Sequence, residues 1–257
     1  MRLWILSDLH LELTRGWDLP FGDARPAFDV LVVAGDLITR MERGVAFLKE
    51  RVAGEVVYVP GNHEFYGTDI DRTVEKARAA AAGSNVHVLQ NDTVTIDGII
   101  FVGATLWTDF NLFGDAEQAM MAAAQSMNDY RKIRLRNYEL RLRPKDTLKR
   151  HIESRDFIAR QLRNGGRHVV VTHHAPHPSG VRRGFERDIV SAAYASDLTD
   201  LIVSGAPELW VYGHSHESRQ DVVGSTRLVT NAKGYGPWPP QLVWDNAHFD
   251  PQLIVEI

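Results

Sequence analysis

Five clusters of polar residues follow short apolar runs along the chain, and they contain Asp, Asn and His side chains. The candidate metal ligands are Asp8, His10, Asp36, Asn62, His173, His214 and His216. Oxygen and imidazole ligands in this mixture suit Mn, Fe, Zn or Co rather than Ca or Mg alone. Seven ligands are too many for one cation. Two cations could use them all by sharing Asp36 and a bridging hydroxide, and such a pair clamps both the attacking and the leaving oxygen of an in-line displacement.

The motifs that contain these residues differ in specificity. Asp-x-His at 8–10 and Gly-Asp at 35–36 are each common in proteins. Gly-His-x-His at 213–216 and Gly-Asn-His-Glu at 61–64 are rare in a chain of this composition. Their joint occurrence, in order and each after an apolar run, favours a metal site over unrelated turn residues.

This ordered set resembles the calcineurin-like metallophosphoesterase family over nearly the whole chain, apart from residues 110–165. The resemblance implies an α/β fold with a two-sheet β-sandwich core flanked by helices. It also implies a dinuclear, metal-dependent phosphoric ester hydrolase. One metal would be held by Asp8, His10, Asp36 and His216, and the other by Asp36, Asn62, His173 and His214.

Two further histidines are interpreted through the same resemblance. His63 is not a ligand in this scheme. It would hydrogen-bond the scissile phosphate or protonate the departing alkoxide, a task that suits a side chain titrating near neutrality. His173 fits the family's ligand position, and we expect the adjacent His174 only to line the site.

A phosphodiester is the favoured substrate, with a nucleotide-derived one as a candidate, and Mn is the favoured metal for activity. Two alternatives stay open. A phosphomonoesterase or a nuclease would share the mechanism and differ in the shape of the pocket. A non-catalytic binding scaffold would typically have lost ligands or the catalytic histidine, and here none is missing.

The composition narrows the class of protein further. A formal net charge of −4 over 257 residues argues against a globally basic nucleic-acid binder, although a local basic site stays open. Cysteine is absent, which excludes disulfides, Cys-ligated zinc and a thiol nucleophile. No apolar stretch approaches the roughly 20 residues of a membrane span, and the run at 3–6 is too short for a signal peptide. We therefore expect a cytoplasmic protein that does not bind membranes; its oligomeric state stays open.

The order of apolar patterns predicts how these residues are brought together. Apolar runs alternate with amphipathic helical patterns near 42–52, 69–82 and 196–203. Continuous β-branched runs such as 169–171 predict strands buried on both faces. This alternation predicts βαβ units, whose sheets place ligand sites beyond the carboxyl ends of the strands. We expect a single domain over 1–257.

Three regions depart from that alternation. Residues 86–105, which surround a turn at 97–98, and residues 219–257 predict antiparallel additions or a second sheet. Residues 110–165 predict an insertion near the edge of the active site, with helices near 115–127 and 145–163. Whether Asn128 and Asp129 reach the site stays open.

A basic segment within this insertion has two interpretations. Residues 131–150 carry nine Lys or Arg against two acids, and apolar residues alternate around Arg136-Asn137. The pattern predicts a short β-ribbon with apolar residues on one face and Arg on the other. It could be a flap that reads phosphates beside the metals, or a solvated basic surface.

Overall fold

The computed structural model describes residues 1–14, 17–237 and 243–257. In this part of the chain, five strands form a first sheet in the order β13-β1-β2-β3-β4. The strands are β1 (Arg2–Leu6), β2 (Val30–Ala34), β3 (Glu55–Val59), β4 (Val86–Val88) and β13 (Ile254–Glu256). The strands β1 to β4 are parallel and β13 is antiparallel at the edge. The carboxyl ends of the four parallel strands therefore meet at one edge.

A second sheet has the order β11-β12-β10-β9-β6-β5 among the described residues. Its strands are β5 (Asp92–Ile96), β6 (Ile99–Ala104), β9 (Arg167–Thr172), β10 (Leu209–Tyr212), β11 (Ser218–Val223) and β12 (Thr226–Asn231). The four central strands are parallel, and β5 and β11 pair antiparallel at the two edges.

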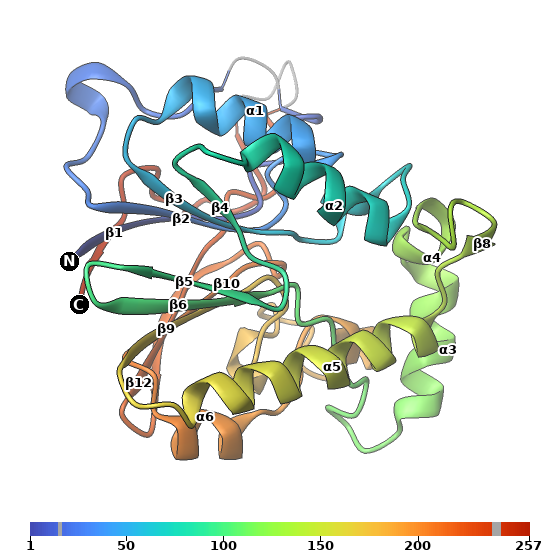
Figure 1. Cartoon of the computed structure of the whole chain (residues 1–257). Coiled ribbons are helices and arrows are strands. Elements are labelled where there is room, and N and C mark those ends of the chain that lie inside the picture. Colours follow the sequence, from blue (N-terminus) through green and yellow to red (C-terminus); the bar gives the residue numbers. More distant parts are fainter. Residues whose placement is uncertain (15–16, 238–242) are drawn as a thin grey trace.

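The two sheets pack face to face around an apolar core, with helices outside (Figure 1). Leu3, Val57 and Val171 are among the fully buried residues between the sheets. The outer face of the first sheet packs against α1 (Met41–Arg51) and α2 (Ile70–Ala81). The second sheet packs against α5 (Pro144–Leu162) and α6 (Thr199–Gly205). The predicted two-sheet sandwich flanked by helices is thus confirmed. No helix in the described ranges is both long and apolar enough to cross a membrane.

The part of the segment between β6 and β9 that precedes α5 lies at the end of the sandwich opposite to the two termini, and α5 runs back along the second sheet (Figure 1). It contains α3 (Ala116–Ser126), α4 (Asp129–Lys132) and the ribbon of β7 (Arg134–Leu135) and β8 (Leu140–Arg141), followed by α5. Short 3₁₀ turns lie at Gly22–Ala24, His63–Phe65, Pro178–Gly180 and Ile189–Ala193. A separate apolar cluster holds this segment against the sandwich, and it includes Phe65, Trp107, Tyr130 and Ile133.

Two details of the predicted strands need correction. The run at 86–88 is not an antiparallel addition: β4 pairs parallel with β3, because its valines bury against the first sheet. Only the hairpin around Asp97-Gly98 is antiparallel. Between β12 and β13, no further strand occurs among the described residues. There the side chains of Asn231 and Asn246 bond the backbone carbonyls of Asp250 and Ala232, which a strand partner would otherwise satisfy.

The predicted one-sided ribbon is wrong beyond its base. Each ribbon strand is only two residues long. Ile133 and Leu142 are buried, but Tyr138 is 47% exposed and Leu140 is 42% exposed. The tip extends past the apolar cluster that covers the base, so its alternating pattern has no surface to bury against.

Candidate metal centre

The seven predicted ligands lie where the two sheets bring their strand ends together. Asp8, Asp36 and Asn62 follow β1, β2 and β3 of the first sheet. His173 and His214 follow β9 and β10 of the second sheet, and His10 and His216 lie two residues beyond Asp8 and His214. Each of the seven residues is at most 9% exposed. The structure therefore brings all seven into one buried region.

The backbone at this edge is left-handed at most of the ligand positions. Asp8, His10, Asp36, His214 and His216 have φ between 46° and 72°. This conformation costs a residue with a side chain roughly 1–3 kcal/mol, and such strain concentrates at functional sites. Asp8 and His10 therefore do not project from an extended strand. The left-handed turn aims them, and their amides are held by the carbonyls of Gly35 and Asp36 at 3.0 and 2.9 Å.

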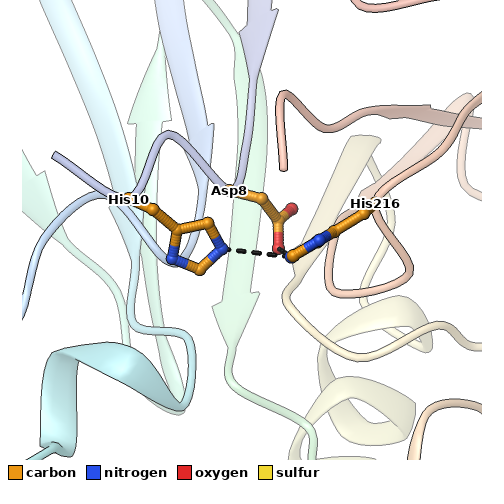
Figure 2. A group of neighbouring side chains, drawn as sticks. All are labelled: Asp8, His10 and His216. Carbon is orange, nitrogen blue, oxygen red and sulfur yellow. Dashed lines mark hydrogen bonds and ion pairs between the residues drawn. The ribbon is translucent and has the colours of Figure 1, made fainter. Parts of the chain in front are cut away.

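Asp8, His10 and His216 form the first group (Figure 2). The Nε2 atoms of His10 and His216 are 3.1 Å apart, and His216 Nε2 lies 3.6 Å from Asp8 Oδ1. His216 Nδ1 lies 2.7 Å from the carboxylate of Asp245, which can only accept a hydrogen bond. The proton of the neutral ring is therefore on Nδ1, and the Nε2 lone pair points into the group.

Asp36, His173 and His214 form the second group. His173 Nδ1 donates to the carbonyl of Ala34 at 2.9 Å, which leaves Nε2 with its lone pair. That nitrogen lies 3.0 Å from Asn62 Oδ1 and 3.1 Å from His214 Nδ1. The lone pairs of Asn62 Oδ1, His173 Nε2 and His214 Nδ1 thus lie close together.

Asp36 lies between the two groups. Its Oδ1 is 3.5 Å from His173 Nε2, and its Oδ2 is 3.8 Å from His10 Nε2. Burial raises the pKa of Asp36 well above its usual range, and the nearby charges of Glu64 and Asp8 raise it further. An ionised carboxylate in this position requires positive charge nearby.

The donor set fits divalent cations. Burial lowers the pKa of His10 and of His173 to about 3, so both rings are neutral and able to coordinate metal. His214 Nε2 is buried and has no hydrogen-bond partner among the described residues. Neutral imidazoles and carboxylates that face each other without a donor repel, and a cation would turn that repulsion into attraction.

Glu64 belongs to the 61–64 motif, but no role for it was predicted from the sequence. Its carboxylate accepts hydrogen bonds from the backbone of Asp36, Leu37 and Gly61 at 2.7–2.9 Å and from the hydroxyl of Tyr58 at 2.7 Å. One side chain thereby holds the loops after β2 and β3 together, and these loops carry Asp36 and Asn62.

Asp129, which the sequence left open, does reach the site. Its Oδ1 accepts from Asn62 Nδ2 at 2.8 Å and from the hydroxyl of Tyr66 at 2.7 Å. Because the amide nitrogen of Asn62 is engaged in this way, its oxygen faces His173. Asp129 comes from α4, so the segment between β6 and β9 contributes directly to the orientation of a predicted ligand.

His63 lies beside the first group and makes a carboxylate contact that the sequence did not predict. Its Nδ1 lies 2.8 Å from Glu12 Oε1, and its Nε2 lies 3.3 Å from the hydroxyl of Tyr235 and 3.9 Å from Asp36 Oδ2. Burial alone would raise the pKa of Glu12, but contacts with His10 and His63 lower it to about 2. Glu12 therefore stays ionised beside the Nδ1 atom of His63.

His174 is placed outside both groups. Its Nδ1 bonds to the carbonyl of Thr105 at 3.2 Å, and its ring packs 4.2 Å from that of His214 and 5.0 Å from that of Trp107. His174 therefore packs against the ring of His214, a predicted ligand.

A cavity of about 320 Å³ opens over these residues, and we call it the catalytic cavity. Its lining includes Asp36, Asn62, His63, His214 and His216, together with Tyr66, Asp129, Arg182, Tyr194, Tyr235 and Asp245. Arg182 is its single Lys or Arg among the described residues, and it pairs with Asp245 at 3.1 Å. Candidate metal ligands that line a water-accessible cavity are suited to a hydrolytic reaction.

Comparisons with known proteins agree with this geometry. The model of the calcineurin-like phosphoesterase family matches residues 1–218. An uncharacterized protein, L509, of Acanthamoeba polyphaga mimivirus is 26% identical over 282 residues, with 98% of this chain and 95% of that protein covered. The crystal structure of a phosphopantetheinyl hydrolase from Mycobacterium tuberculosis superposes with a TM-score of 0.65 at 20% identity, over 91% of this chain and 89% of that one. A dimetal phosphatase from Danio rerio has a TM-score of 0.50 at 12% identity, over 89% and 86% of the two chains. The likeness to the two solved structures shows a shared fold.

We predict that Gly61→Ala disrupts the site through one methyl group. A Cβ at this position would lie 2.2 Å from Asp36 Oδ1 and 2.8 Å from His173 Cε1, so Asp36 must shift. Displacement of a ligand by an outer contact typically costs about 10–100-fold in metal affinity. Calorimetric titration with Mn²⁺ measures the loss. Gly165→Ala is the matched control, because its Cβ would have no neighbour within 4 Å. Wild-type affinity in Gly61→Ala would contradict the placement of Asp36.

Proposed function

Because this chain belongs to the calcineurin-like phosphoesterase family, we propose that it hydrolyses a phosphodiester with two divalent cations and with His63 as the proton donor. One observation carries the proposal. Two groups of buried acceptor atoms face inward on either side of the Asp36 carboxylate, and this arrangement has no use without cations.

In this proposal the two cations have separate ligands and one shared ligand. Asp8, His10, Asp36 and His216 would hold the first cation. Asp36, Asn62, His173 and His214 would hold the second. When bound, a pair of divalent transition metals supplies a nucleophile at neutral pH and neutralises the charge that develops on the phosphoryl oxygens. Mixed oxygen and imidazole ligands suit Mn, Fe, Zn or Co, and Mn is the metal we propose for assays.

His63 is suited to donate a proton to the leaving group. Glu12 holds its Nδ1 proton and stabilises the positive charge of the protonated ring, while Nε2 faces the cavity near Asp36 and Tyr235. As the ester P–O bond breaks, the Nε2 proton passes to the departing oxygen. One water is consumed, and the products are an alcohol and a phosphomonoester.

The surroundings of His63 favour a diester over a monoester. His63 and Tyr66 line the catalytic cavity and also a second cavity of about 680 Å³, which we call the His63-side cavity. Space on both sides of these two residues accommodates the two ester groups of a diester. A monoester would use only one of them.

A substrate panel tests the proposed function. With Mn²⁺ added, we expect bis-p-nitrophenyl phosphate to be hydrolysed faster than p-nitrophenyl phosphate, and a chelator to abolish both activities until metal is restored. Faster hydrolysis of the monoester would replace the proposal with a phosphomonoesterase. Full activity in a protein verified to be free of metal would end the metal mechanism.

We predict that His63→Ala slows the chemical step while the protein retains its metals. The loss should be roughly 10²–10⁴-fold, which is typical of a removed general acid. It should be smaller for esters of p-nitrophenol than for esters of alkyl alcohols, because p-nitrophenolate needs little protonation. Steady-state kinetics across a series of leaving groups measures the difference.

Glu12→Gln removes the charge of Glu12 but keeps its shape, and we test it on the same series of leaving groups. The amide keeps a hydrogen-bond acceptor near Nδ1 but cannot stabilise the protonated ring, so we expect about a tenfold loss that also grows with leaving-group pKa. Equal losses across all leaving groups would make His63 a phosphate-positioning residue. Loss of metal in His63→Ala would make it a ligand.

A further inference from the structure

The His63-side cavity continues the active site past the proton donor. It shares His63 and Tyr66 with the catalytic cavity, and the rings of these two residues pack in a tilted arrangement with centroids 4.2 Å apart. The side chain of Lys132 lies over Tyr66, with Nζ 4.9 Å from the centroid of the Tyr66 ring. A group that leaves the scissile phosphorus on the side of His63 therefore moves toward Lys132.

The sign of the charge changes across His63. The catalytic cavity is lined by Asp36, Asp129, Asp188 and Asp245 against Arg182 among its described residues. The basic residues that line the His63-side cavity are Arg40, Arg131, Lys132 and Arg134. Among the described residues of its lining, Glu12 is the single acidic residue. Glu12 is engaged by His63 at 2.8 Å. Arg40 also pairs with Glu42 at 3.9 Å, so among the described residues the uncompensated positive charge of the His63-side cavity comes from Arg131, Lys132 and Arg134.

The basic residues nearest His63 and Tyr66 are Lys132 and Arg134. Their backbone is held in place, but their side-chain charges are not neutralised. The carbonyl of Lys132 accepts from the amide of Gly67 at 3.0 Å, and the amide of Arg134 donates to the carbonyl of Thr68 at 2.9 Å. These bonds tie the segment to the loop after His63. Among the described residues, neither Lys132 nor Arg134 forms an ion pair. Fixed backbone and unpaired side-chain charge together suit an anionic ligand.

We propose that the His63-side cavity binds a second phosphate group of the substrate, carried by the leaving group. This inference rests on the proposed function, since it takes His63 as the proton donor. The proton donor must face the leaving oxygen, so the remainder of the leaving group extends into the cavity on that side. Lys132 and Arg134 then select leaving groups that carry a phosphate, and the preferred substrates are small molecules with two phosphate groups.

The ribbon's remaining arginines provide a matched control. Arg136 and Arg141 are exposed and do not line the His63-side cavity. The double variant Lys132→Gln/Arg134→Gln therefore removes the same charge from the same segment as Arg136→Gln/Arg141→Gln. Only the first pair touches the proposed phosphate site.

The test is competition against the hydrolysis of bis-p-nitrophenyl phosphate by the Mn²⁺-loaded enzyme. The probes are alkyl monophosphates and the matching alkanediol bisphosphates, with linkers of three to six carbons. We expect a bisphosphate to inhibit more strongly than its monophosphate, and Lys132→Gln/Arg134→Gln to reduce this preference about tenfold. Arg136→Gln/Arg141→Gln should keep it. Added salt should weaken the wild-type preference, because exposed charges are screened within about 10 Å at 0.1 M.

Equal preferences in the two double variants would overturn the inference and leave a solvated basic surface. A gain in affinity that keeps rising along single-stranded DNA of increasing length would overturn the small-substrate assignment. Neither result would affect the proposed function, which fails only if bis-p-nitrophenyl phosphate shows no chelator-sensitive hydrolysis.

Discussion

The buried carboxylate of Asp36 sets the constraint on which the site depends. The side-chain nitrogens of His10 and His173 lie within 4 Å of it, and burial keeps both rings neutral near pH 7. Removing an ionised group from water without a charged partner costs several kcal/mol, and here Asp8 and Glu64 add negative charge. The proposed cations resolve this conflict, because their charge stabilises the carboxylate on both sides.

The fold supplies the rigidity that such a cluster requires. Two sandwiched sheets bring the ends of β1, β2, β3, β9 and β10 to one edge, and the left-handed residues after them turn the ligands inward. The strain of these turns is offset by backbone bonds between neighbouring loops and by the carboxylate of Glu64, which ties the loop of Asp36 to that of Asn62. The sandwich core keeps the strand ends in register, so the ligands cannot move apart without disrupting the sheets.

The sequence predicted what is encoded locally. Apolar runs that end in Asp, Asn or His identified the strand ends that carry the candidate ligands, and helical periodicity located α1, α2, α3 and α5 to within a few residues. It could not identify Glu12, Asp129 or Asp245 as partners, because each meets its histidine or asparagine only through tertiary contacts, separated by 51, 67 and 29 residues. The direction of β4 and the exposed ribbon tip were also missed, since the same apolar pattern serves an edge strand, a hairpin or a solvated ribbon.

The proposed function rests on a difference between the two cavities that meet at His63. Acidic and aromatic residues line the cavity on one side of His63, and basic residues line the cavity on the other side. The proposed proton donor lies between them.

All of these proposals depend on a pair of cations that share Asp36. Anomalous diffraction from crystals grown with Mn²⁺ tests that claim most directly. We expect two peaks about 3.5–4 Å apart, one on each side of the Asp36 carboxylate. A single peak, or two peaks that do not share Asp36, would contradict it.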